Sequence, residues 1–243
     1  MKNHRILTIL LAIIFFHMFT PVIEAGERIR IQLTPLQQTT LSAEIAAKIS
    51  GLPLREGDSF KEGQILTIFD CSIHEAQMNK ASATAEAARQ TLKVNTRLAE
   101  LGSISSLELD QSAAKVKETE AELAAMTTIV SKCTVKAPFS GRLAKLYVEN
   151  HQYMTPGKPI MDIIDMTHLE ARLIVPSRWL LWLKVGGVFT IHIDELNRSY
   201  RARVIRLSPR IDPVSRTISM TGRIEGLHPE LLPGMSGWAI FAK

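Results

Sequence analysis

Two segments of the chain, residues 45–71 and 132–167, share one pattern of apolar and polar positions. Each alternates apolar with polar residues, passes through a polar turn, and turns again at Gly63 or Gly157 before a second apolar run. This pattern predicts strand–turn–strand in both segments. The alignment superimposes Ile49 on Leu143, Leu52 on Leu146, Leu54 on Val148, and Leu66 on Ile160. A single copy is too short to bury a core alone, so we expect the copies to pack on each other; two unrelated hairpins are the alternative.

The two copies differ at one turn position. His151 stands in the second copy where the first copy has Gly57. Glycine adopts backbone conformations that other residues avoid, so we expect the first turn of the second copy to have a different shape.

Residues 72–131, between the copies, carry a helical pattern. The first half places apolar or alanine residues at alternating three- and four-residue steps, which is typical of a coiled-coil seam. The seam consists of Met78, Ala81, Ala85, Ala88, Leu92 and Ala99, with Asn95 as an interruption. A Ser72-x-x-Glu75 capping box is expected to begin this helix, and Leu101-Gly102 to end it.

A second helix follows almost at once. Its expected seam is Leu109, Ala113, Val116, Leu123 and Val130, with Glu120 and Thr127 as weaker members. Ser105-x-x-Glu108 is a second capping box, and Gly102 to Ile104 alone join the helices, so the two must be antiparallel neighbours. No third amphipathic helix is present in the sequence to complete a bundle, so we expect a hairpin that projects from a β domain.

The rest of the chain has the pattern of strands. From about Leu169, short runs such as "FTIHI", "YRARVIRL" and "RTISMTGRI" alternate with turn-forming segments, which predicts a small β-barrel in residues 168–243. The lone strand "ERIRIQL", within residues 26–44, is expected to join this barrel. The predicted fold class is therefore mainly β with a long α-helical hairpin.

The N-terminus has the layout of a secretory signal peptide. A short basic start precedes the apolar run Ile6 to Phe19, and Pro21 and Ala25 follow it. The run is too short to span a membrane comfortably, so we expect residues 1–25 to be removed before Gly26; an uncleaved anchor is the alternative. The mature chain is then expected in an oxidising compartment, which in a bacterium is the periplasm.

Composition and motifs argue against several classes of function. The formal net charge of +5 includes Lys2 and Arg5 of the predicted signal, and the remaining excess is too mild to indicate nucleic-acid binding. We find no catalytic constellation, cofactor motif or metal-ligand spacing, and His74, His151, His168 and His192 are far apart in sequence. Met154, Met161 and Met166 fit a β core, although a soft-metal site is the alternative.

The order of these elements resembles the periplasmic adaptor proteins, or membrane fusion proteins, of tripartite efflux pumps and type I secretion systems (the HlyD-like family). The likeness rests on "REGDSFKEGQIL", "VKAPFSGRLAKLYV", "MTPGKPIMDIID", "IDPVSRT" and "LLPGM". It implies that residues 45–71 and 132–167 are two halves of a biotinyl/lipoyl-like β-sandwich, which an antiparallel coiled-coil hairpin splits.

The family also has a motif at the hairpin tip, Arg-x-x-x-Leu-x-x-x-x-x-x-Ser, that contacts the outer-membrane channel. Leu98 and Ser105 match it by spacing, whereas Val94 occupies the arginine position and Arg97 is the candidate substitute. We therefore expect the partner-binding residues to be Arg97, Leu98, Leu101, Gly102 and Ser105. An apolar Leu98 at the far end of the rod is expected to be exposed and free for a partner.

The resemblance implies a mechanical function without catalysis. The chain is expected to bridge an inner-membrane transporter and an outer-membrane channel, and to assemble into a ring of six copies. Two alternatives remain. A non-transport envelope scaffold would use the same hairpin for docking. A biotin or lipoate carrier would present one lysine at the turn between the half-motifs, where this chain has the helical insertion.

The two cysteines flank the predicted hairpin. Cys71 precedes the first helix and Cys133 follows the second, and antiparallel helices bring those ends together within disulfide range. In an oxidising compartment we expect them to form a disulfide; two buried free thiols are the alternative.

Overall fold

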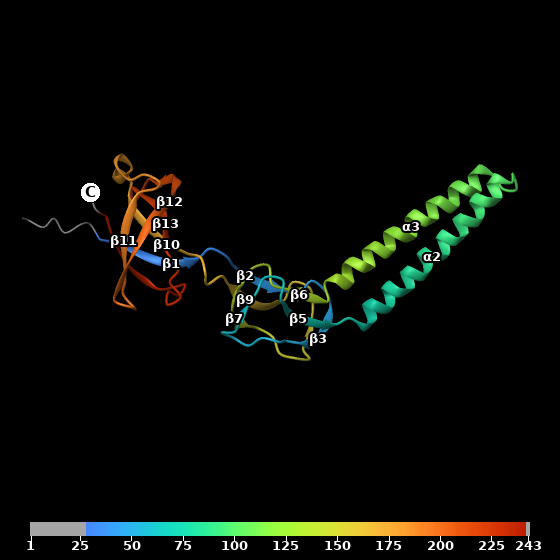
Figure 1. Cartoon of the computed structure of the whole chain (residues 1–243), viewed down its shortest axis with the longest axis horizontal. Helices are drawn as coiled ribbons and strands as arrows, with labels where there is room; N and C mark the ends of the chain where they lie inside the picture. The colour runs from blue at the N-terminus through green and yellow to red at the C-terminus, as the bar shows by residue number, and fades with distance from the viewer. Residues whose placement is uncertain (1–27, 242–243) are drawn as a thin grey trace, which may run out of the picture. The chain divides into compact units, whose positions relative to one another are not determined.

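The computed structural model of the chain describes residues 28–241. The predicted signal segment, residues 1–25, lies outside them. The chain divides into two compact units, one formed by the residues up to Thr34 together with those from Glu170, and the other by Pro35–Leu169. The predicted fold class is confirmed in both: one unit is a β-barrel, and the other is a β-sandwich that carries a two-helix hairpin (Figure 1).

The barrel is closed and has the strand order β1-β10-β13-β12-β11-β14. Its strands are β1 (Ile29–Pro35), β10 (Leu169–Pro176), β11 (Val188–Ile193), β12 (Arg198–Asp212), β13 (Thr217–Ile224) and β14 (Ser236–Ile240), and the short helix η1 (Ser177–Leu181) follows β10. Alternation along the strands directs one face inward, as in β10, where Ala171, Leu173 and Val175 are buried and Arg172 is exposed. The N-terminal strand β1 closes the barrel against β14, through pairs such as Ile31 with Gly237.

The sandwich consists of two four-stranded sheets with the orders β2-β9-β7-β4 and β6-β5-β3-β8. Its strands are β2 (Gln38–Ser42), β3 (Ala47–Gly51), β4 (Ser59–Phe60), β5 (Ile65–Asp70), β6 (Thr134–Lys136), β7 (Gly141–Leu146), β8 (Tyr153–Met154) and β9 (Pro159–Ile164). Strands β7, β8 and β9 follow β3, β4 and β5 by the same sequence offset that relates Gly63 to Gly157. Each sheet takes strands from both copies, which confirms that the copies pack on each other.

The expected boundary of the barrel segment was wrong. Residues 26–44 were assigned to the barrel as a whole, but only β1 belongs there, and Gln38–Ser42 forms β2 of the sandwich, where it pairs with β9. Strand β2 occupies in the first copy the place that β6 has in the second, at the edge of its sheet. The chain therefore passes from one unit to the other at Thr34 and Pro35.

The prediction that the turn at His151 has a different shape was also wrong. His151 has a φ of 69° and Gly57 a φ of 89°, so both lie in the left-handed region. The two turns make equivalent hydrogen bonds, because the amide of Gly57 donates to Leu143 O (2.8 Å) and the amide of His151 donates to Ile49 O (3.0 Å). The repeat therefore places His151 in the left-handed region, although a side chain disfavours that conformation.

This equivalence predicts different outcomes for two substitutions. Gly57→Ala is expected to lower the free energy of unfolding by about 1 kcal/mol, because a Cβ at a positive φ strains the backbone although no atom lies within 4 Å of it. His151→Gly is expected to change it by less than about 0.5 kcal/mol, because relief of that strain offsets the added chain entropy. Denaturant titration of both variants measures this, and a neutral Gly57→Ala would contradict it.

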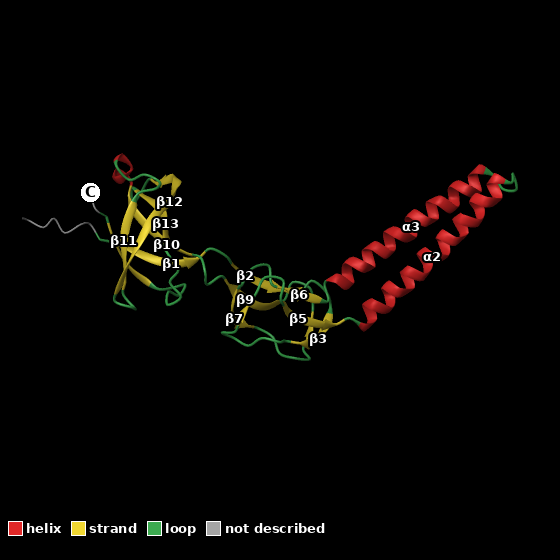
Figure 2. Ribbon diagram, viewed as in Figure 1, coloured by secondary structure: helices red, strands yellow, loops and turns green. Residues whose placement is uncertain are grey.

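The hairpin consists of α2 (Ser72–Glu100) and α3 (Ser106–Ser131), which lie antiparallel (Figure 2). Every expected seam residue of the first helix is buried or half-buried, which confirms that seam. In α3, the weaker members Glu120 and Thr127 are exposed, and Thr119 and Met126 take their places. Glu120 instead accepts a hydrogen bond from Arg89 Nε of α2 at 2.8 Å.

The two expected capping boxes had different outcomes. The Ser105–Glu108 box is confirmed, whereas the Ser72–Glu75 box is wrong. Helix α2 has Cys71 as its N-cap, without a side-chain cap, and the amide of Ser72 donates to Asp70 Oδ1 at 3.2 Å. This bond from the Ser72 backbone, with a further contribution from the Ser72 side chain, lowers the pKa of Asp70. The carboxylate at the start of the helix is therefore that of Asp70, the last residue of β5, whereas the sequence pattern had assigned this role to Glu75.

Candidate partner-binding surface at the hairpin tip

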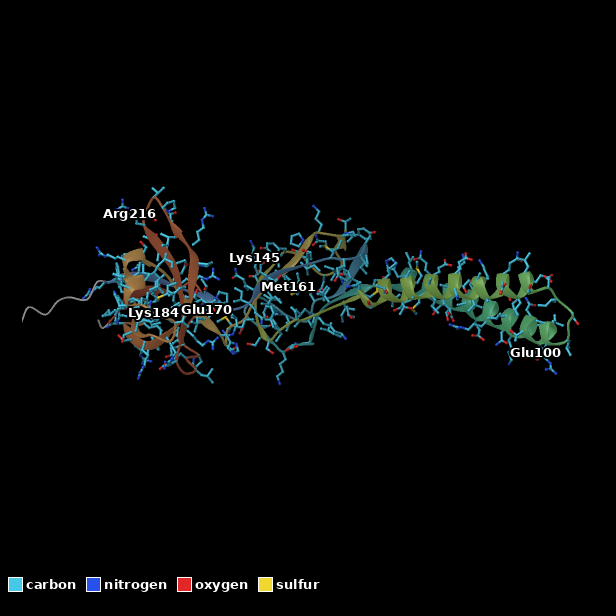
Figure 3. All side chains as sticks on the ribbon, turned by 90° about the horizontal axis from the view of Figure 1, so that it is seen from above. Glu100, Lys145, Met161, Glu170, Lys184 and Arg216 are labelled. Atoms are coloured by element: carbon cyan, nitrogen blue, oxygen red, sulfur yellow. A yellow bond between two sulfur atoms is a disulfide. The ribbon has the colours of Figure 1, made fainter. Side chains whose placement is uncertain are left out.

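The first helix ends in a compact turn at the far end of the hairpin, where Figure 3 labels Glu100. Gly102 has a φ of 68°, its amide donates to Ala99 O (2.9 Å), and the amide of Ser103 donates to Leu98 O (2.8 Å). These two bonds form a Schellman motif, which satisfies the last carbonyls of the helix. Because glycine carries no Cβ, Gly102 allows the chain to reverse within a few residues.

The second helix begins with a reciprocal cap. The Ser105 hydroxyl accepts from the amide of Glu108 (3.2 Å), and Glu108 Oε2 accepts from the amide of Ser105 (2.9 Å) and from its hydroxyl (3.0 Å). The bond from the Ser105 backbone, followed by that from its side chain, lowers the pKa of Glu108. Both helix ends are thus fixed, and the side chains at the tip are held on a defined backbone.

Removal of this cap has a predicted dependence on pH. Ser105→Ala is expected to lower the free energy of unfolding by about 1 kcal/mol at neutral pH. A carboxylate whose pKa is lowered on folding stabilises the fold at pH values above its unfolded-state pKa. This stabilisation is lost as the pH falls through the folded-state pKa. The difference between variant and wild type should therefore shrink in acid. Melting curves from neutral to acidic pH measure it, and a difference that grows in acid would contradict this role of Glu108.

Two leucines form the exposed apolar surface of the tip. Leu101 and Leu107 are each 64% exposed, and we call this pair the tip patch. The expected docking residue Leu98 is instead half-buried. It lies one residue before the seam residue Ala99, so it sits at the edge of the helix–helix contact. Leu107 was missed, although its position two residues before Leu109 places it off the seam and was a usable signal.

Polar residues around the tip patch are bound within the hairpin. Arg97 Nη1 lies 2.7 Å from Glu100 Oε2, and the Arg97 side chain is 73% exposed. A surface ion pair of this kind contributes little to stability. The guanidinium therefore remains accessible to a partner, one helical turn before the tip.

The base of the hairpin is tied to the sandwich in three ways. Cys71 and Cys133 form a disulfide with their Cα atoms 6.0 Å apart, and both are buried in the sandwich core. Lys132 Nζ lies 2.7 Å from Glu44 Oε2, and Ile129 packs with Val130 against the same core. These contacts join the two ends of the hairpin to one body.

Other chemically notable residues have structural explanations. Met154 and Met161 lie in the sandwich core, and Met166 is half-buried. The buried Glu170 carboxylate accepts from Arg206 Nη2 at 2.8 and 2.7 Å. Among residues 28–241, no cluster of three or more histidine, cysteine or acidic side chains has the arrangement of a metal site. Within the same range, no helix is long and apolar enough to cross a bilayer.

Comparison with known proteins identifies the hairpin. Residues 71–135 match the family model described as the alpha-helical hairpin domain of RND (resistance–nodulation–division) membrane fusion proteins. The range begins at Cys71 and includes Cys133.

Relatives extend the likeness over most of the chain. Nodulation protein NolF of Rhizobium meliloti (strain 1021) is 26% identical over 86% of this chain and 61% of its own length. Macrolide export protein MacA of Escherichia coli O157:H7 is 24% identical over 82% of this chain and 62% of its own. The chain thus spans about three fifths of the length of these two curated relatives.

Solved structures agree with this fold. The crystal structure of a MacA–MexA chimeric protein, which contains the Pseudomonas aeruginosa MexA α-hairpin domain, superimposes with a TM-score of 0.78. It is 16% identical and covers 90% of this chain and 83% of its own. The resemblance inferred from the sequence is confirmed.

Proposed function

Because this chain has the fold of the membrane fusion proteins and carries their RND-type hairpin domain, we propose that it is a periplasmic adaptor subunit of an efflux or secretion system. It bridges an inner-membrane transporter and an outer-membrane channel, and it has no catalytic role of its own. The transporter supplies the energy, and the adaptor aligns and seals the conduit.

One observation carries the proposal, namely the tip patch on a rigid rod. A helix rises 1.5 Å per residue, so α2 (Ser72–Glu100) places the tip about 44 Å from the hairpin base. Leu101 and Leu107 are exposed there on a capped, disulfide-anchored hairpin. Exposed apolar side chains so far from the sandwich core reduce solubility unless a partner covers them, and we propose that the channel is that partner.

The assembly follows from the resemblance. We propose a ring of six copies in which the lipoyl-like sandwiches stand side by side and the hairpins form a tube. The transporter selects the cargo. The two relatives are named for nodulation and for macrolide export, and we propose neither role for this chain.

The proposed location is the periplasm. The apolar run Ile6 to Phe19 followed by Ala25 directs export, and an oxidising compartment suits the Cys71–Cys133 disulfide.

Affinity purification from cross-linked envelopes tests the bridging role. A tagged chain should recover one inner-membrane transporter and one outer-membrane channel together, in a complex whose mass corresponds to several adaptor copies. Recovery of an envelope complex without a transporter would instead support the scaffold alternative and reject the proposal.

A further inference from the structure

One end of the barrel combines exposed apolar side chains with basic residues. Residues 177–187, which include η1, connect β10 to β11 at this end, and the turn between β12 and β13 lies beside them, since the amide of Ser177 donates to Arg216 O at 2.9 Å. We call it the η1 end. Figure 1 shows both segments at the same end of the barrel, and Figure 3 labels Lys184 and Arg216 on them.

Three apolar side chains of this connection are exposed to solvent in whole or in part. Leu181 is 87% exposed, Val185 is 63% exposed and Trp182 is 38% exposed, and we call them the η1 patch. The alternate positions Trp179 and Leu183 are each only 3% exposed. The connection is thus amphipathic, with one face inserted into the barrel and the other presented outward.

Ring contacts and hydrogen bonds fix the backbone of residues 177–187, so the exposed side chains cannot turn into the barrel core. Trp179 packs edge-on against Phe241, with ring centres 5.0 Å apart, and Trp182 lies 5.0 Å from Trp179. Lys184 Nζ donates to Leu180 O at 2.9 Å, and the amide of Gly186 donates to Val204 O at 2.8 Å. Leu181 and Val185 are therefore exposed by a rigid backbone and not by a loose loop.

Charge is distributed unevenly between the two units. Residues 28–34 and 170–241 carry twelve Arg or Lys and six Asp or Glu, a net charge of +6, whereas residues 35–169 carry fourteen and sixteen, a net charge of −2. Strand directions place five of the six barrel acids at the end opposite η1; these are Glu170, Asp194, Glu195, Glu225 and Glu230. The basic residues at the η1 end include Arg178, Lys184, Arg210 and Arg216. The η1 end therefore combines exposed apolar side chains with an excess of positive charge.

We propose that the η1 end binds the surface of a membrane that contains anionic phospholipids. Leucine, valine and tryptophan side chains that project from a rigid backbone enter the boundary between headgroups and acyl chains, while arginine and lysine pair with the phosphates. The charge of the η1 end supports this occupant, because Lys184, Arg210 and Arg216 lie there, and Asp212 is the sixth of the barrel acids and the one at this end.

This proposal goes beyond the adaptor role and does not depend on channel docking. It assigns the barrel a direct lipid contact, which would orient the chain at the membrane without a partner protein.

Vesicle binding tests it with matched variants of the purified, processed chain. Wild type should cosediment with vesicles of phosphatidylethanolamine and phosphatidylglycerol, and much less with phosphatidylcholine alone. Leu181→Gln combined with Val185→Gln should lower the partition coefficient about tenfold, and Lys184→Gln about fivefold. Leu227→Gln is the control, since Leu227 is 82% exposed at the opposite end of the barrel and its variant should bind as wild type does. The tip variant Leu101→Asp should also bind normally, which separates this result from any failure of the adaptor role.

A second measurement tests whether Trp182 itself contacts the lipid. Brominated lipids should quench the fluorescence of Trp182, and Trp182→Phe should remove most of the quenching while melting curves show a folded barrel. The proposal is overturned if wild type does not bind anionic vesicles, or if Leu227→Gln weakens binding as much as the η1 variants. It is equally overturned if a photo-cross-linker at Leu181 in intact envelopes captures a protein in place of lipid.

Discussion

Leu101→Asp combined with Leu107→Asp is expected to abolish transport and channel docking while leaving the melting temperature within a few degrees of wild type. Both side chains are 64% exposed, so their replacement removes little buried apolar surface from the fold. At an interface, by contrast, two buried carboxylates without partners carry a heavy desolvation penalty. A transport assay and a melting curve on the same preparation measure the two effects.

The control for this variant lies at the other end of α2, the helix that Leu101 caps. Ile73→Asp changes a side chain that is 71% exposed at the hairpin base, so it matches Leu101→Asp in chemistry and exposure but not in position. It should transport normally. Equal loss of transport in both variants would mean that any charge on the hairpin is harmful, and unfolding of the tip variant would mean that the tip is packed inside the protein.

Loss of the disulfide is expected to have the largest effect on stability. The Cys71–Cys133 bridge links residues 62 positions apart, and the chain-entropy model then gives about 4 kcal/mol as an upper value for its contribution. Cys71→Ala with Cys133→Ala should lower the free energy of unfolding by about 2–4 kcal/mol. Denaturant titration under oxidising conditions measures it.

Reduction separates the crosslink from the packing of the sulfur atoms. Wild type treated with a reductant should lose most of the stability that the double variant loses, because the side chains stay in place and only the bond is removed. If both thiols of the untreated protein react with an alkylating reagent after denaturation, the bridge does not form in the native protein.

The repeat was predictable because it depends on short-range sequence patterns. Apolar alternation and the left-handed glycines Gly63 and Gly157 specify two strand–turn–strand units, and burial of their apolar faces requires that they pack together. The hairpin followed for the same reason, since seam residues such as Ala81 and Val116 repeat at helical spacing.

The errors arose where tertiary contacts override local pattern. Strand β2 is polar and exposed along much of its length, and only its pairing with β9 identifies it as part of the sandwich. His151 adopts a glycine-like conformation because its amide completes a bond across the repeat to Ile49.

The position of the hairpin tip was predictable from the sequence, but the set of side chains that it exposes was not. The tip itself, with Leu101, Gly102 and Ser105, followed from the caps, which are local signals. Which leucine faces outward depends on how α2 and α3 are rotated against each other. That rotation half-buries Leu98 and exposes Leu107, and single-helix periodicity does not determine it.

Site-specific photo-cross-linking in living cells tests the central claim most directly. A cross-linking amino acid at position 101, with the same substitution at position 73 as control, should form an adduct with an outer-membrane channel only from position 101. Absence of that adduct from cells in which the chain is abundant, or an equal adduct from position 73, would contradict the account of the hairpin tip as the surface that docks the channel.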